Sequence, residues 1–115
     1  MTESRTINVQ EILRQKMGLD EVISIAGTPS GTTLAIVVAD ALQSSSLDIQ
    51  LDFSGIYSMS GSATCAFWLY LGTRVGLDAI GRIGFTHLEP SAMEALKYGL
   101  DSARERLGPT HKAAG

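Results

Sequence analysis

The clearest hydrophobic pattern in the chain runs from residue 47 to residue 74. Apolar and polar residues first alternate, and this period of two predicts a strand with one buried face and one polar face. The apolar members of the strand are Leu47, Ile49, Leu51 and Phe53. A turn rich in serine and glycine follows, and nearly every residue from 63 to 71 is apolar. This second part predicts a helix that is buried on almost all sides.

Residues 8–17 carry the signals of a short N-terminal helix. Asn8 is a favourable N-cap, and Glu11 lies where the second member of a capping box belongs. Ile7 and Ile12 occupy the two positions of a hydrophobic staple. Gly18 suits the left-handed residue that ends many helices.

Residues 27–42 predict a turn followed by a second apolar helix. The helix covers residues 34–42, and either Ser30 or Thr32 is its cap. A strand over residues 34–38 is the alternative, because the sequence Ile-Val-Val favours β structure. The alanines and the length of the apolar run favour the helix.

Two further strands and a last helix complete the pattern. β-branched residues predict a strand at residues 22–26, and apolar alternation predicts another at residues 82–86. Pro90 suits the first turn of a third helix, and Gly108 followed by a proline stops it. Gly99 either ends this helix at Tyr98 or lies inside it.

Strands that alternate with helices predict an α/β domain with a small, mostly parallel sheet. Asp48, Gln50 and Asp52 all point to one face of what should be an inner strand. A parallel sheet with helices on both sides would be apolar on both faces. We therefore expect the helices on one face only. We expect a single domain over residues 1–108, with residues 109–115 as a flexible tail.

Composition and charge exclude several function classes. The chain has 115 residues, of which 44% are apolar and 18% charged, with a formal net charge of −3. Nucleic acid is not an expected partner because the basic residues are scattered, and no apolar run is long enough for membrane insertion. The polar N-terminus lacks the apolar core of a signal peptide. Because Cys65 is the single cysteine, a reducing compartment and hence a cytoplasmic location is expected.

The turn between Gly27 and Thr33 is the first candidate site. It joins a predicted strand to a predicted helix, as a phosphate-binding loop does, but it lacks the lysine and the spacing of that motif. An ordinary capped turn is the simpler interpretation. The alternative function is a small-ligand, nucleotide or anion-binding protein, with a weak anion site at Ser30, Gly31 and Thr32.

Catalysis by Cys65 and His87 is a further hypothesis. A thiol and a base are present, but no third group that would orient the base is visible. A core cysteine and a loop histidine are the simpler interpretation. Because the chain has only 2 histidines, we expect no metal site, and no motif calls for a cofactor.

The turn before the central helix holds four hydroxyl side chains: Ser58, Ser60, Ser62 and Thr64. Helix capping is their simplest role, because a hydroxyl oxygen accepts bonds from the first free N–H groups. Phosphorylation is the functional alternative. A phosphate there would suit the helix dipole and would add about two negative charges to a binding surface.

Two helices that are apolar on nearly all sides are more than a sheet covered on one face can bury. Trp68, Leu69, Val38 or Ala41 is then expected to form an exposed apolar patch, which usually marks an interaction surface. Burial under the N-terminal helix is the competing interpretation. A homodimer that buries the two helices is a second alternative.

Residues 22–100 resemble the STAS domain of anti-sigma factor antagonists. In that family a strand of the form Leu-Asp-hydrophobic-Ser/Thr-Gly-Val precedes Asp-Ser-Ser-Gly and an apolar helix. The corresponding segments here are Leu51-Asp52-Phe53-Ser54-Gly55-Ile56, Ser60-Gly61-Ser62-Ala63 and, after the helix, Leu96-Lys97-Tyr98-Gly99-Leu100. The phosphorylated serine of the family falls on Gly61 and its preceding aspartate on Ser60. A helix replaces the strands that usually open the domain.

The resemblance implies a non-enzymatic regulatory module that binds a protein partner, such as a regulatory kinase, through the start of its central helix. The expected contact residues are Ser58, Ser60, Gly61, Ser62, Thr64 and Trp68. A serine switch of the anti-anti-sigma type would use Ser60 or Ser62 as phosphoacceptor. We expect Ser62→Asp and Trp68→Ala to change partner binding without changing folding.

Overall fold

Parallel strands and four α-helices make up the fold in a computed structural model that describes residues 4–108. The predicted tail at residues 109–115 lies outside the described residues. Strands β1, β3 and β5 form one sheet in the order β1-β3-β5, and β2 pairs with β4 in a second, smaller sheet. All these pairings are parallel. The elements are β1 (Ser4–Asn8), α1 (Val9–Met17), β2 (Ser24–Ile25), α2 (Thr28–Ser44), β3 (Asp48–Asp52), β4 (Ser58–Met59), α3 (Gly61–Arg74), the 3₁₀ helix η1 (Leu77–Arg82), β5 (Ile83–Thr86) and α4 (Pro90–Leu107).

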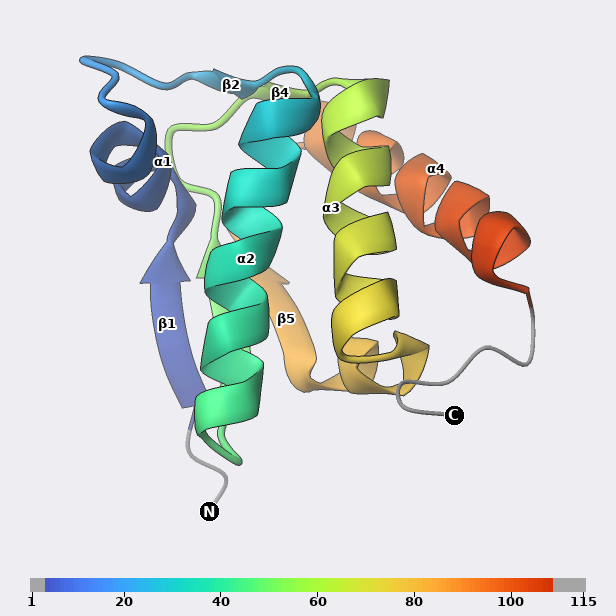
Figure 1. The fold of residues 1–115 in the computed structure, drawn as a ribbon. Helices are drawn as coiled ribbons and strands as arrows, with labels where there is room; N and C mark the ends of the chain where they lie inside the picture. The colour runs from blue at the N-terminus through green and yellow to red at the C-terminus, as the bar shows by residue number, and fades with distance from the viewer. Residues whose placement is uncertain (1–3, 109–115) are drawn as a thin grey trace.

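Helices α2 and α3 lie side by side over one face of the three-stranded sheet (Figure 1). Helix α1 lies beside α2 at the β1 end, and α4 packs on the far side of α3 and against β4. The first turns of α2 and α3 lie next to the short β2–β4 pair. This arrangement confirms a small α/β domain with parallel strands.

The sheet has the two chemically different faces that its sequence predicts. Ile7 of β1, Leu51 of β3 and Phe85 of β5 lie in register. Ile7 and Leu51 are buried and Phe85 packs against the core. On β3 the polar residues Asp48, Gln50 and Asp52 are only half-buried.

An aromatic cluster fills the space between α3 and the sheet. The rings of Phe67 and Trp68 lie 4.8 Å apart, and Trp68 lies 6.1 Å from Phe85. Phe85 in turn lies 6.0 Å from Phe53, which follows β3. Such large rings contribute much of the apolar area that a small core removes from water.

Several predicted helix ends are confirmed. The Asn8 side chain accepts a hydrogen bond from the Glu11 N–H, and Gly18 ends α1 in the left-handed conformation with φ of 65°. Residues 34–38 are helical and not a strand, because they belong to α2. The last helix runs through Gly99 and stops before Gly108.

Three predictions about the elements are wrong. Residues 4–8 form strand β1, so a strand does precede the first helix. The strand expected at residues 22–26 is reduced to β2, because only Ser24 and Ile25 pair with β4. Helix α2 begins at Thr28, with Gly27 as N-cap and Pro29 in the first turn, so Ser30 and Thr32 lie inside the helix and do not cap it.

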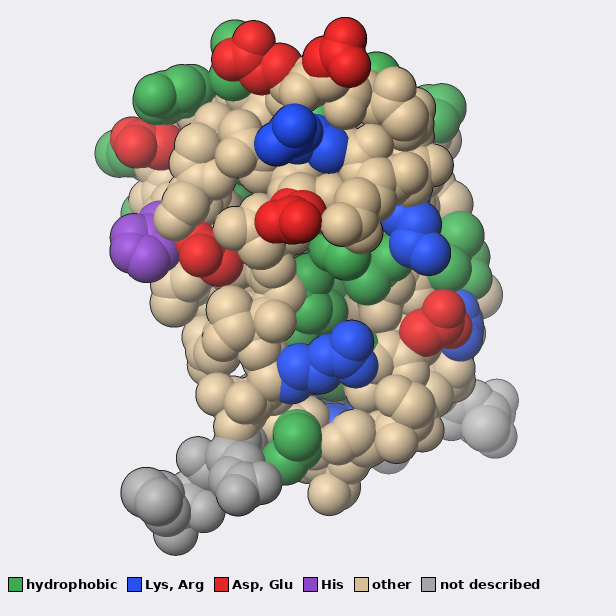
Figure 2. Space-filling view, turned by 90° about the vertical axis from the view of Figure 1, so that its left-hand side faces the viewer, with side chains coloured by type: hydrophobic (Ala, Val, Ile, Leu, Met, Phe, Trp, Pro, Cys, Tyr) green, Lys and Arg blue, Asp and Glu red, His purple; other side chains and the backbone are tan. Residues whose placement is uncertain are grey.

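On the side formed by β1 and α1, the described residues form no large patch of one charge. Figure 2 shows acidic and basic side chains interspersed there, with hydrophobic side chains between them. Within residues 4–108, the apolar stretches of all helices are too short or too polar for a membrane span.

Candidate functional site

Ser60 connects the beginnings of the two central helices. It is the N-cap of α3, and its Oγ accepts a bond of 3.1 Å from the Ala63 N–H. The same oxygen accepts a bond of 3.0 Å from the N–H of Gly27, the N-cap residue of α2. Both acceptor positions of this hydroxyl are therefore occupied by backbone donors. Ser60 has a structural role that the capping interpretation predicted only in part.

Ser62 is the more accessible of the two phosphoacceptor candidates. It lies in the exposed first turn of α3, and its Oγ is 3.2 Å from the Ser60 Oγ. Gly61 beside it is also exposed. The first turn of α3 carries no acidic side chain, so a phosphate on Ser62 would meet the positive end of the helix dipole without a competing carboxylate.

Thr64 and Trp68 are buried, and their predicted contact with a partner is wrong. Trp68 is 2% exposed and donates its Nε1–H to the Leu96 carbonyl of α4 at 2.8 Å. Thr64 is fully buried against Gly99, and its Oγ1 has no hydrogen-bond partner among the described residues. Both lie under α4, a helix whose position no local pattern reveals.

The expected exposed apolar patch is also largely wrong. Val38 and Ala41 of α2 are buried, as is Trp68. Only Leu69 is partly exposed. The sheet, α1, α4 and the contact between α2 and α3 together cover the other sides of the two helices.

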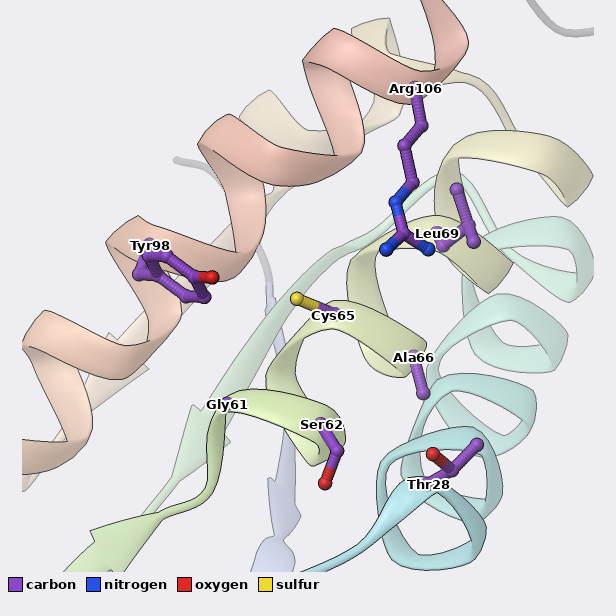
Figure 3. Close-up of a pocket in the computed structure, with 8 residues that line it drawn as sticks. All are labelled: Thr28, Gly61, Ser62, Cys65, Ala66, Leu69, Tyr98 and Arg106. Carbon is purple, nitrogen blue, oxygen red and sulfur yellow. The ribbon is translucent and has the colours of Figure 1, made fainter.

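An open hollow of about 470 Å³ nevertheless remains beside α3 (Figure 3). The first turn of α2 borders it on one side and α4 on the other. Its lining residues are Thr28, Gly61, Ser62, Cys65, Ala66, Leu69, Tyr98 and Arg106. A second hollow of about 320 Å³ shares three of these residues and is lined by Thr28, Thr32, Ala66, Leu69, Tyr70 and Thr73. We call the two adjoining hollows the α3 groove.

Two exposed tyrosines, Tyr98 and Tyr57, are not among the site residues that the sequence predicts. Tyr98 of α4 is 63% exposed and lines the α3 groove. Tyr57 is 62% exposed just before β4, where its N–H donates to the Ile23 carbonyl. The half-buried Ser58 follows it. The helical spacing of Leu96, Gly99 and Ala103 indicates that Tyr98 is exposed, because it places Tyr98 on the outer side of α4.

The Gly27–Thr33 segment does not form a phosphate loop. Gly31 is buried so closely against the Ala63 carbonyl that a Cβ there would collide with it. The Ser30 Oγ donates to the Met17 sulfur at 3.5 Å, and Thr32 lines the α3 groove. The three predicted anion-binding residues therefore do not converge on one hollow.

Cys65 and His87 belong to different places in the fold. Cys65 lines the α3 groove. His87 follows β5, where its Nδ1 lies 3.0 Å from the Asp52 Oδ1, and it is not among the residues that line the hollow around Cys65. Hydrogen bonds from the Ser54 side chain and N–H, assisted by His87, lower the pKa of Asp52. Within residues 4–108 no three His, Cys, Asp or Glu side chains gather in a way that would hold a metal ion.

Comparisons with protein-family models, with curated proteins and with solved structures give no match to this chain. A functional proposal therefore rests on the geometry of the α3 groove and on the STAS-like sequence motifs.

Proposed function

We propose that this protein is a non-enzymatic, STAS-like regulatory module that binds a protein partner through the α3 groove and the first turn of α3. The observation that carries the proposal is the open apolar side of α3. Cys65, Ala66 and Leu69 line a hollow there, whereas the opposite side of the helix, which includes Phe67 and Leu71, is buried. Apolar surface that stays open in a small domain commonly marks an interaction site.

A macromolecular partner fits this groove better than a compact ligand. The lining residues of α3 extend from Gly61 to Thr73, which corresponds to about 18 Å along a helix axis. The exposed ring of Tyr98 lines the same groove. Tyrosine is enriched at binding interfaces because it offers a large rigid surface and a polar tip.

Ser62 is the residue through which we propose that binding is regulated. The hydroxyl of Ser60 holds the two helix starts together, whereas that of Ser62 lies in an exposed turn. A phosphate on Ser62 would add about two negative charges at the edge of the groove. Regulation of this kind fits a kinase as partner and a cytoplasmic location.

The test is site-specific photocrosslinking in the cells that naturally produce the protein. A photoreactive amino acid at Ser62 should capture one defined protein, and the same amino acid at the exposed Lys16 of α1 should not. Leu69→Asp should abolish the Ser62 crosslink, because it places a charge in the apolar groove. Mass spectrometry of the parent protein, without the photoreactive amino acid, should locate phosphate on Ser62 and not on Ser60. Equal capture from both positions, or capture that survives Leu69→Asp, would reject the docking surface.

A further inference from the structure

Arg106 brings to the α3 groove a positive charge that forms no ion pair with the described residues. It extends from the last turn of α4 toward α3 and lies near Leu69 and Cys65 (Figure 3). The ion pairs found within residues 4–108 involve Arg74, Arg82 and His87, and none involves Arg106. The guanidinium group therefore has five N–H donors available for a binding partner.

Among residues 4–108, none of those that line the groove is acidic. The first turns of α2 and α3, which border it, also contain no acidic side chain. The whole chain has a net charge of −3, so this absence is a local departure from the average. Charge complementarity at an interface favours a partner segment of opposite sign.

The apolar part of the groove limits the partner further. Ala66 and Leu69 of α3 form its floor, Cys65 lies beside them, and Tyr98 stands at the α4 side. A fully charged segment would leave this surface without contacts. A segment that alternates apolar and acidic side chains would fill the hollow and reach Arg106 at the same time.

We infer that the partner places an acidic, amphipathic segment of its own chain in the α3 groove, with a carboxylate on the Arg106 guanidinium. This inference rests on the proposed docking function and specifies the chemistry of the partner. An Arg–carboxylate pair can form two parallel hydrogen bonds, which fixes the register of the segment as well as its affinity.

The test uses a displayed library of random peptides, selected on the purified protein. Enriched peptides should combine Asp or Glu with large apolar residues. Their affinity should fall at least tenfold for Arg106→Glu and for Leu69→Asp. Arg104→Glu is the matched control, because Arg104 lies on the same exposed helix end but does not line the groove, and this variant should bind as the parent does.

The two hypotheses fail in different ways. Peptides that lose binding on Leu69→Asp but are neutral or basic, or that bind Arg106→Glu unchanged, would overturn the acidic partner and leave the docking groove in place. Peptides that are insensitive to both substitutions, or no enrichment at all, would overturn the groove as well. Circular dichroism of each variant verifies that the fold is retained.

Discussion

Individual glycines decide how closely the helices of this protein approach one another. Gly31 of α2 lies against the Ala63 backbone of α3, and Gly99 of α4 lies against Thr64 of the same helix. A Cβ at either position would collide with backbone atoms or with a side chain that the core confines. Gly61 is different, because a Cβ there would meet only a ring carbon of Tyr98 at an ordinary 3.8 Å.

Gly31→Ala and Gly61→Ala should therefore have opposite effects on stability. Gly31→Ala forces α2 and α3 apart and should lower the free energy of unfolding by about 3 kcal/mol, as overpacking of a core does. Gly61→Ala should raise it by about 0.5 kcal/mol, because alanine loses less backbone entropy in a helix. Urea denaturation measures both. A Gly31→Ala variant as stable as the parent would show that the contact between α2 and α3 is looser than described.

Asp52 should make stability depend on acid pH. Its pKa is lowered from 3.8, mainly by hydrogen bonds from the Ser54 side chain and N–H and also by His87. A pKa that is lower in the folded state stabilises the protein above the unfolded value, and this stabilisation is lost as the pH falls through the folded value. The parent should therefore have a higher free energy of unfolding than Asp52→Asn. This difference should be constant at neutral pH and shrink below about pH 4.

Urea denaturation over a pH series measures this difference. Asp78→Asn is the control, since the exposed Asp78 has no ion pair or side-chain hydrogen bond among the described residues. If the difference in free energy of unfolding between the parent and Asp52→Asn stayed constant down to the lowest pH of the series, the bonds to Ser54 and His87 would not favour the charged form of Asp52.

At the scale of elements, the sequence is most informative where the signal is local. Asn8, Glu11 and Gly18 define both ends of α1, because capping depends on residues within one turn. Strand β1 was missed because Ile7 is its one buried residue and its pairing partner β3 is distant in the sequence. The start of α2 was misplaced because Gly27 caps without a side chain, although Pro29 marked the first turn.

Arg82, at the junction of η1 and β5, forms hydrogen bonds to the connection between α2 and β3. Its guanidinium donates to the carbonyl oxygens of Leu42, Ser45 and Leu47 at 3.2, 2.8 and 2.7 Å. These bonds occupy the unpaired carbonyl end of α2 and hold the chain entering β3. One planar group thus links the end of α2 to the chain that enters β3, at the edge where β3 and β5 begin to pair.

Arg82→Ala should lower the free energy of unfolding by about 2–3 kcal/mol, because hydrogen bonds from a charged donor to backbone acceptors are lost. Arg82→Lys should recover less than half of that loss, since one ammonium group cannot reproduce the planar fork. Arg5→Ala is the control for loss of charge, because Arg5 is exposed on β1. Thermal unfolding distinguishes the outcomes. Full recovery by lysine would mean that charge alone, and not the geometry of the fork, stabilises this junction.

At the scale of the molecule, the candidate site was less predictable than the fold. Strand polarity correctly indicated two different sheet faces, since Ile49 and Leu51 alternate with polar residues within one segment. The α3 groove instead arises where α2, α3 and α4 meet, and Arg106 reaches it from more than thirty residues away in the chain. The sequence alone places Trp68 at the surface, because no local hydrophobic pattern shows that α4 packs against α3.

The tertiary arrangement also changes the expectation about self-association. A homodimer is one of the alternatives that the sequence offers for burying the two apolar helices, but Val38, Ala41 and Trp68 are already buried within a single chain. Of the large hydrophobic side chains that stay exposed, Met93 and Tyr98 lie on α4, Ile36 lies on α2, and Leu19, Ile23 and Tyr57 lie in the connections between elements. A stable dimer usually needs a continuous interface of at least about 1,000 Å².

We therefore predict a monomer, with a mass of 12.2 kDa by light scattering over a wide dilution series. The α3 groove is too small to hold two copies together without further contacts, and Arg106 of one copy would meet no carboxylate in the groove of the other. A doubled mass that Leu69→Asp returns to the monomer value would contradict this prediction. A second copy would then occupy the groove, and the partner described above would have to displace it.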